Sequence, residues 1–260
     1  VVLAIALAGA EPARIETEAA RQEAVAARDE ADRQSDRQRA ILDFLVRDLL
    51  QTDDDRPVDA DLTLAAALDA AMPRIETRFA GDPEAAGILY RSFALLYADL
   101  GVIERSLAAR ERGAELTGAR WGRDHGFSGI ALLQYAQGLG DADRWDEAER
   151  VAREAHRVIT ERAGDADGAA PPQFQVFARV VWADTLQVLG RHDEARPLLR
   201  QAIDIAGGQG MRAEELYCLN ILGASLLATD EYREALKVIE TELAGARDVH
   251  PPGHPQIMSA

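Results

Sequence analysis

Apolar residues recur at helical spacing along most of this chain. From residue 41 onward, large apolar side chains fall three and four positions apart, and no segment alternates apolar and polar residues as a half-buried strand would. Alanine dominates the apolar set and aromatic residues make up only 5% of the chain, which favours helix over strand. The pattern predicts an all-α fold.

The N-terminal part has a different pattern from the rest. Residues 1–10 are apolar and end in small residues, which predicts the trailing end of a transmembrane helix or a signal segment, with an ordinary buried segment as the alternative. Residues 11–40 are rich in Ala, Glu, Arg and Gln and polar all round, which predicts a charged helical stalk. The apolar face returns at Ile41, so we place the start of the folded domain there.

The remaining chain contains four similar units. Each has an apolar helical stretch, a turn residue, a small residue five positions later and a second helical stretch. The turn residues are Gly101, Asp143, Gly190 and Asp230, and the small residues are Ser106, Ala148, Ala195 and Ala235. Further small residues occur in the second stretch, at Gly113, Ala155 and Ala202. Two antiparallel helices approach closely only where small side chains lie at their crossing, so each unit predicts a helical hairpin.

This arrangement resembles the tetratricopeptide repeat (TPR), which has a large residue, a Leu, a small residue and an aromatic on its first helix and an Ala on its second. The match is best over 176–206 and 216–242, and weakest at the first turn, where Ile103 and Ser106 replace the usual aromatic and Ala. The resemblance implies a TPR-like solenoid over residues 41–250 and the start of a further repeat at 251–260.

The units are longer than the standard repeat. Their small residues are spaced by 42, 47 and 40 positions, against about 34 in a standard unit. We assign the extra length to loops at about 118–126, 161–173 and 207–213. Longer units of this kind are similar to those of kinesin-light-chain-like and bacterial regulatory TPR proteins.

The order of apolar run, charged stalk and repeats resembles the region after the membrane span in bacterial serine/threonine kinases or winged-helix regulators. That resemblance implies a sensor or scaffold region of a larger bacterial signalling protein. Its repeats are then expected outside the cytoplasm, on a membrane-anchored or exported protein, although a cytoplasmic location stays open.

Several chemistries are not indicated by the sequence. A formal net charge of −16 disfavours a nucleic-acid partner, which requires a basic face. Gly207–Gly210 lacks the Lys-Ser/Thr of a phosphate loop and is typical of a helix stop. His250 and His254 are separated by Pro-Pro-Gly, which indicates a linker and not a helical metal site. The single cysteine, Cys218, is interpreted as a buried thiol. We therefore predict no catalytic residues, no cofactor and no metal.

The leading functional hypothesis is a protein-interaction module that holds a protein or peptide in a groove lined by the first helix of each unit. The groove candidates are Arg91, Gln134, Gln137, Asp184, Tyr217 and Asn220, with ordinary solvated helix surface as the alternative for each. A second hypothesis is self-association, in which this chain forms a homo-oligomer and thereby dimerises a membrane-anchored regulator. The third is an enzyme whose site has no recognisable motif.

Overall fold

The computed structural model describes residues 2–47, 63–161 and 170–249. Within these ranges the regular structure is entirely α-helical, which confirms the predicted fold class. The helices are α1 (Val2–Arg47), α2 (Leu64–Arg78), α3 (Pro83–Asp99), α4 (Ile103–Trp121), α5 (Gly126–Asp141), α6 (Trp145–Glu161), α7 (Pro172–Val188), α8 (His192–Gly208), α9 (Arg212–Ala228) and α10 (Tyr232–Val249).

The chain divides into two compact units at Arg74 and Ile75. In the first unit, α1 is a single helix that runs without interruption through both the predicted apolar segment and the predicted stalk. Residues 21–34 are exposed on every side of this helix, as expected for a polar sequence, whereas Phe44 near its end is fully buried. No described helix combines the length and the apolar character needed to cross a membrane.

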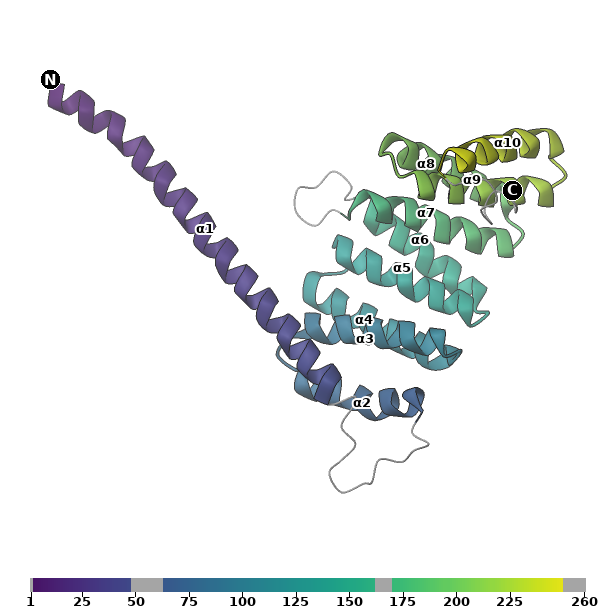
Figure 1. The fold of residues 1–260 in the computed structure, drawn as a ribbon, viewed down its shortest axis with the longest axis horizontal. Helices are drawn as coiled ribbons and strands as arrows, with labels where there is room; N and C mark the ends of the chain where they lie inside the picture. The colour runs from purple at the N-terminus through teal and green to yellow at the C-terminus, as the bar shows by residue number, and fades with distance from the viewer. Residues whose placement is uncertain (1, 48–62, 162–169, 250–260) are drawn as a thin grey trace. The chain divides into compact units, whose positions relative to one another are not determined.

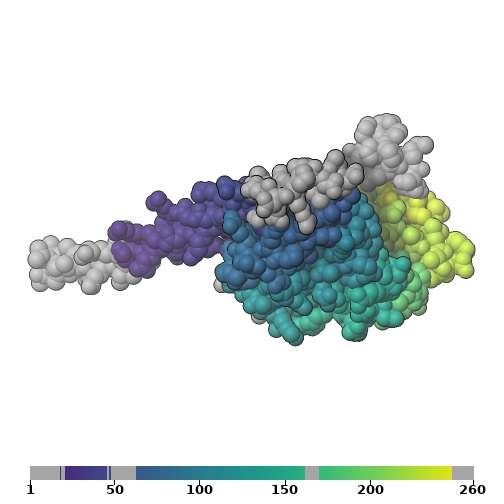
Figure 2. Space-filling model, turned by 90° about the horizontal axis from the view of Figure 1, so that it is seen from below, coloured from purple at the N-terminus to yellow at the C-terminus, as the bar shows by residue number. Residues whose placement is uncertain are grey.

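The second unit is a stack of four helical hairpins, α3/α4, α5/α6, α7/α8 and α9/α10 (Figure 1). Each hairpin packs against its neighbours in the stack, through α4 and α5, α6 and α7, and α8 and α9. The colour in the space-filling view accordingly changes in order along this unit, from blue to yellow (Figure 2). This is the quasi-one-dimensional packing of a solenoid, in which every unit depends on its neighbours for burial.

The four hairpin turns have one backbone geometry. Gly101, Asp143, Gly190 and Asp230 have φ angles of 72°, 58°, 73° and 61°, all in the left-handed region. The residue after each of them donates its main-chain N–H to a carbonyl near the end of the preceding helix, for example Arg191 to Leu186 at 2.8 Å. This satisfies a carbonyl that the helix end would otherwise leave unpaired. The predicted turn positions are therefore confirmed.

The predicted small residues lie at the helix crossings. Ala148, Ala195 and Ala235 are 0% exposed, and Ser106 is also buried. On the second helices, Ala155 and Ala202 are 0% exposed, and Gly113 packs against α3.

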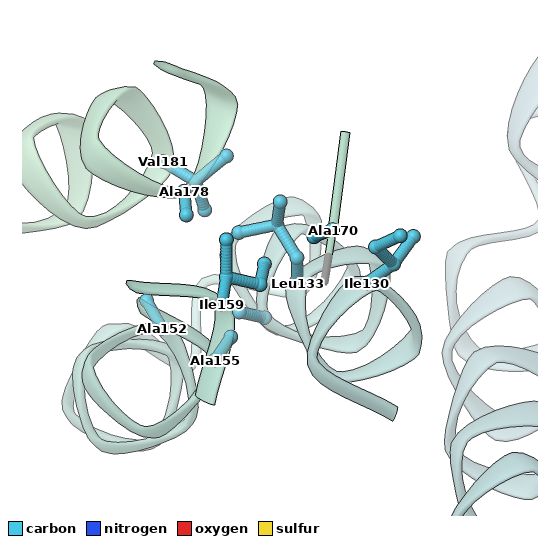
Figure 3. Packing of buried hydrophobic residues seen from close by; sticks show 9 residues of the cluster. Ile130, Leu133, Ala152, Ala155, Ile159, Ala170, Ala178 and Val181 are labelled. Atoms are coloured by element: carbon cyan, nitrogen blue, oxygen red, sulfur yellow. The ribbon is translucent and has the colours of Figure 1, made fainter. Parts of the chain in front are cut away.

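The core is continuous between hairpins. Figure 3 shows one cluster in which side chains from three successive helices meet. Its labelled members include Ile130 and Leu133 of α5, Ala152, Ala155 and Ile159 of α6, and Ala178 and Val181 of α7. Because α7 completes the core of the α5/α6 hairpin, neighbouring units cannot fold independently of each other.

The predicted loops are partly wrong. Residues 118–121 continue α4, which ends only at Trp121, and residues 207 and 208 are the last of α8. The reason is that a glycine does not end a helix by its presence alone. Helix α8 ends only where a residue with left-handed backbone follows, and that residue is Gly210, whose φ is 69°. Part of the extra repeat length therefore lies in helices. The segments 48–62, 162–169 and 250–260 lie outside the described residues, and so do the predicted start of a further repeat at 251–260 and the linker around His250 and His254.

Replacing Ala148, Ala195 or Ala235 by Leu should lower the free energy of unfolding by roughly 1–3 kcal/mol, because a larger side chain forces the crossing helices apart. Denaturant titration of each variant measures this. If all three midpoints stay where they are in the wild type, the alanines do not hold the helices at contact distance.

The hairpin turns allow a test in which a substitution should stabilise the protein. Replacing Asp143 by Gly should stabilise the protein by about 0.5–1 kcal/mol, because glycine adopts positive φ without the steric cost of a side chain. The matched change of Gly190 to Ala should destabilise it by about 1 kcal/mol for the same reason. Equal melting temperatures for wild type and both variants would contradict the turn geometry.

Candidate functional site

Every first helix of a hairpin exposes at least one large apolar side chain, whereas only one of the four second helices, α10, does so. The large apolar residues exposed on helices α3, α5, α7 and α9 are Leu95, Phe127, Val188, Tyr217 and Leu227. The second helices α4, α6 and α8, which are described over their full length, expose none. Contacts also join α5 to α7 and α7 to α9 directly, so the first helices form one face of the stack.

A pocket of about 220 Å³ lies on this face between α3 and α5. Three of the predicted groove residues line it, and the structure therefore brings them together. The full lining is Arg91, Ala94, Leu95, Arg110, Gln134, Gln137 and Asp141. More than half of the Leu95 side chain, 57%, is exposed, so the pocket has an apolar side as well as a cationic one.

Arg110 reaches the pocket from the second helix, α4. It is 9% exposed, and its Nη1 donates to the main-chain carbonyl of Gln134 at 2.8 Å, while Nη2 lies 3.5 Å from a carboxylate oxygen of Asp141. The path of this side chain requires a glycine on α5, since a Cβ at Gly138 would lie 2.7 Å from Arg110 Cδ. Burial lowers the pKa of the Arg110 guanidinium, and the charge of Asp141 opposes that shift.

Ser106 positions the Arg110 side chain through hydrogen bonds. Its hydroxyl donates to the carbonyl of Ala94 at 2.8 Å and accepts from Arg110 Nε at 3.4 Å. The departure from the repeat pattern at this position is thus part of a polar network that connects α3, α4 and α5. Alanine at residue 106 could make neither bond.

Two polar groups at the pocket are incompletely satisfied. The Oε1 atom of Gln134 is buried without a hydrogen-bond partner in the described part of the chain. Burial lowers the pKa of Arg91, partly offset by the charge of Glu84, and no described carboxylate lies within ion-pair distance of it. Buried polar groups cost free energy unless they are paired. Gln134 Oε1 is closed to a ligand in this arrangement, whereas an anionic ligand in the pocket could pair with Arg91.

A second, more apolar pocket of about 180 Å³ lies between α7 and α9. It is lined by Gln173, Phe174, Val176, Phe177, Val180, Glu214 and Tyr217. Tyr217 is 54% exposed, so it forms an accessible aromatic rim over the phenylalanines of α7.

Asp184 is largely buried beside this part of the face. Burial raises its pKa to about 6. Its charge in turn contributes to raising the pKa of Tyr217 and of Cys218, although burial is the larger cause for both. The pKa of the Cys218 thiol rises to about 12, which keeps it protonated and unreactive near neutral pH.

Asn220 is placed differently from the other candidates. It lies on α9 and donates from Nδ2 to a carboxylate oxygen of Glu242 on α10, at 3.2 Å. Glu242 is buried, which raises its pKa, and the Asn220 hydrogen bond opposes that shift. The structure therefore gives Asn220 a contact within its own hairpin, whereas Arg91, Gln134 and Gln137 face a shared pocket.

Sequence reasoning did not find Arg110, Leu95 or the phenylalanines of α7. Ser106 and Gly138, as exceptions to an apolar repeat pattern, were the available signals for Arg110. Among the described residues, no group of three or more His, Cys, Asp or Glu side chains is arranged to hold a metal ion.

Comparison with known proteins shows the fold. No protein-family model and no curated protein sequence matches this chain. Among solved structures, TPR-like repeats of a kinesin light chain from Podospora anserina are 15% identical, with a TM-score of 0.55 over 71% of this chain and 89% of that one.

Two longer proteins have the same architecture. RapI in its apo form is 12% identical, with a TM-score of 0.60 over 81% of this chain and 69% of that chain. Aspartyl phosphate phosphatase F from Bacillus subtilis is 11% identical, with a TM-score of 0.61 over 85% of this chain and 55% of that chain. The fold is therefore a TPR-like helical solenoid, as the resemblance in sequence implied.

Asp184 provides a pH-dependent test of the site. Its folded-state pKa of about 6 lies above its ordinary value, so the folded protein holds a proton that the unfolded chain has already released. Stability should therefore fall as pH rises from about 4 through about 6, and Asp184→Asn should remove this loss. We expect the variant to melt higher than the wild type at pH 8 and at nearly the same temperature at pH 4.5. Thermal melts at both values decide, with Asp204→Asn on the exposed surface of α8 as control; an equal gain for both variants would contradict burial of Asp184 as the cause.

Proposed function

We propose that this chain is a protein-interaction module whose first-helix face, formed by α3, α5, α7 and α9, binds a segment of a partner protein. The observation that carries the proposal is that each of these four helices exposes at least one large apolar side chain, whereas α4, α6 and α8 expose none. Exposed apolar residues that gather on one face of a soluble protein indicate a binding surface. The TPR-like fold supports this reading, because solenoids use such aligned faces for recognition.

The two pockets specify what the segment carries. At the α3/α5 pocket, Arg91 and Arg110 face a single carboxylate, Asp141, so a side chain that brings a carboxylate or an amide oxygen is favoured there. At the α7/α9 pocket, Phe174, Phe177 and Tyr217 favour an apolar or aromatic side chain.

The distance between the pockets sets the length of the segment. Neighbouring packed helices lie about 8–10 Å apart, so two such steps across the face amount to about 20 Å. The offset along the helices adds to this, because one pocket is lined by the later part of α5 and the other by the start of α7. An extended chain therefore needs at least about six residues to join the two pockets. The partner segment is therefore a short peptide stretch with an acidic or amide residue near one end and an apolar residue near the other.

The test compares variants on the two faces. A groove variant combines Arg91→Gln, Leu95→Ser and Tyr217→Ser. We expect it to capture the native partner at least tenfold more weakly, because the truncation of anchoring side chains in an interface costs more than about 1.4 kcal/mol together. Quantitative pull-down from the source cell measures this, and melting temperatures establish that each variant is folded.

The control variant combines Arg150→Gln and Arg153→Gln on α6, whose side chains are 65% and 58% exposed. Substitutions at such positions shift stability by no more than about 0.5 kcal/mol. The control should capture the partner as the wild type does. Equal capture by the groove variant and the wild type would refute the proposal, and equal loss in both variants would point to charge alone.

A further inference from the structure

The last described helix, α10, departs from the other second helices. Tyr232 and Leu236 on α10 are 62% and 58% exposed, whereas α4, α6 and α8 expose no large apolar side chain. This surface does not belong to the first-helix face, and the proposed groove does not account for it.

The repeat register shows which residues of the earlier units are equivalent to Leu236. The position directly after the buried small residue is occupied by Leu107, Glu149, Arg196 and Leu236 in the four units. The first three are between 3% and 9% exposed, and all three contact the following unit. Leu107 packs with Leu139 of the next hairpin.

The two charged residues at this position make equally specific contacts. Glu149 accepts a hydrogen bond from Trp182 Nε1 at 3.3 Å and lies 3.7 Å from Arg191. Arg196 forms an ion pair with Glu231. Leu236 thus occupies a position that contacts the following unit in every earlier repeat, but it has no such neighbour among the described residues.

We infer that α10 pairs with α10 of a second copy of this chain, in an antiparallel two-fold contact centred on Leu236. A two-fold axis perpendicular to the helix makes the two copies of α10 antiparallel, as α8 and α9 are antiparallel within the chain. The contact therefore continues the same series of interfaces. A symmetric pair also needs only one patch, used twice.

The charges around Leu236 suit this pairing. Arg233 lies three residues before it and Glu240 four residues after it, both exposed and on the same edge of the helix. Neither forms an ion pair within the described part of the chain. When the two-fold axis passes between Leu236 and Lys237, Arg233 of one copy faces Glu240 of the second copy, and the symmetry repeats that pair. Opposite charges in register favour this partner over an unrelated apolar surface.

A chemical feature of the sequence makes the contact directly testable. Lys237, next to Leu236 and exposed, is the only lysine of the chain. In the proposed dimer the two Lys237 side chains flank the symmetry axis, so an amine-reactive cross-linker with a spacer of about 10 Å, the separation of packed helices, can join them. We expect a covalent dimer in which mass spectrometry identifies a Lys237–Lys237 peptide.

The second arm measures mass in solution by sedimentation over a range of concentrations. The wild type should shift toward twice the monomer mass, and Leu236→Glu should raise the dissociation constant at least tenfold. Leu100→Glu, at an exposed apolar position in the turn after α3, is the matched control and should dimerise as the wild type does. Circular dichroism verifies that both variants fold.

A charge exchange tests the register. Arg233→Glu should weaken the dimer, because it brings glutamates together, and the double variant Arg233→Glu/Glu240→Arg should restore it. A wild type that stays monomeric at every concentration, which would leave the surface to a further hairpin or another protein, overturns the inference. So does a dimer that persists unchanged in Leu236→Glu. Neither result affects the groove proposal, whose variants lie on α3 and α9.

Discussion

The close approach of paired helices over small buried side chains is the constraint on which the rest of this structure depends. With alanine at the crossings at residues 148, 195 and 235, the two helices of a hairpin meet at contact distance, and their larger apolar residues are displaced to both sides. One side completes the hairpin's own core and the other completes that of its neighbour, as Ala178 and Val181 do for the α5/α6 pair. Hairpin geometry and stacking are therefore set by the same residues.

Each interface between successive hairpins also contains a buried charged or polar contact, and these contacts differ. Arg110 donates to the backbone of Gln134, Glu149 accepts from Trp182, and Arg196 pairs with Glu231. A buried charge is costly unless its particular partner is present. Chemically distinct contacts therefore disfavour a hairpin that packs against the wrong neighbour, which a repetitive apolar core alone would permit.

The sequence allowed the local features of this fold to be predicted better than the features that depend on distant residues. The turn residues were readable because glycine and aspartate at a fixed distance from a small residue mark a chain reversal. The helix ends near residues 118 and 207 were wrong because the end depends on a left-handed residue further on. Arg91, Gln134 and Gln137 line one pocket because they occupy the same face of successive first helices, which the repeat register made readable from the sequence. Arg110 was missed because it reaches that face from another helix, through space that Gly138 on α5 leaves open.

The repeat also determines which side chains are exposed where the described stack ends. In a stack, a side chain that serves the next unit is buried only while a next unit is present. Leu107, Glu149 and Arg196 meet that condition, and Leu236, in the equivalent position, is 58% exposed. A soluble solenoid reduces such exposure either with a polar outer face on its last helix or by covering the apolar one. On α10, the last helix that the structure describes, Tyr232 and Leu236 are exposed and Arg233 and Glu240 lie before and after the leucine, and this composition supports the pairing proposed for its outer face.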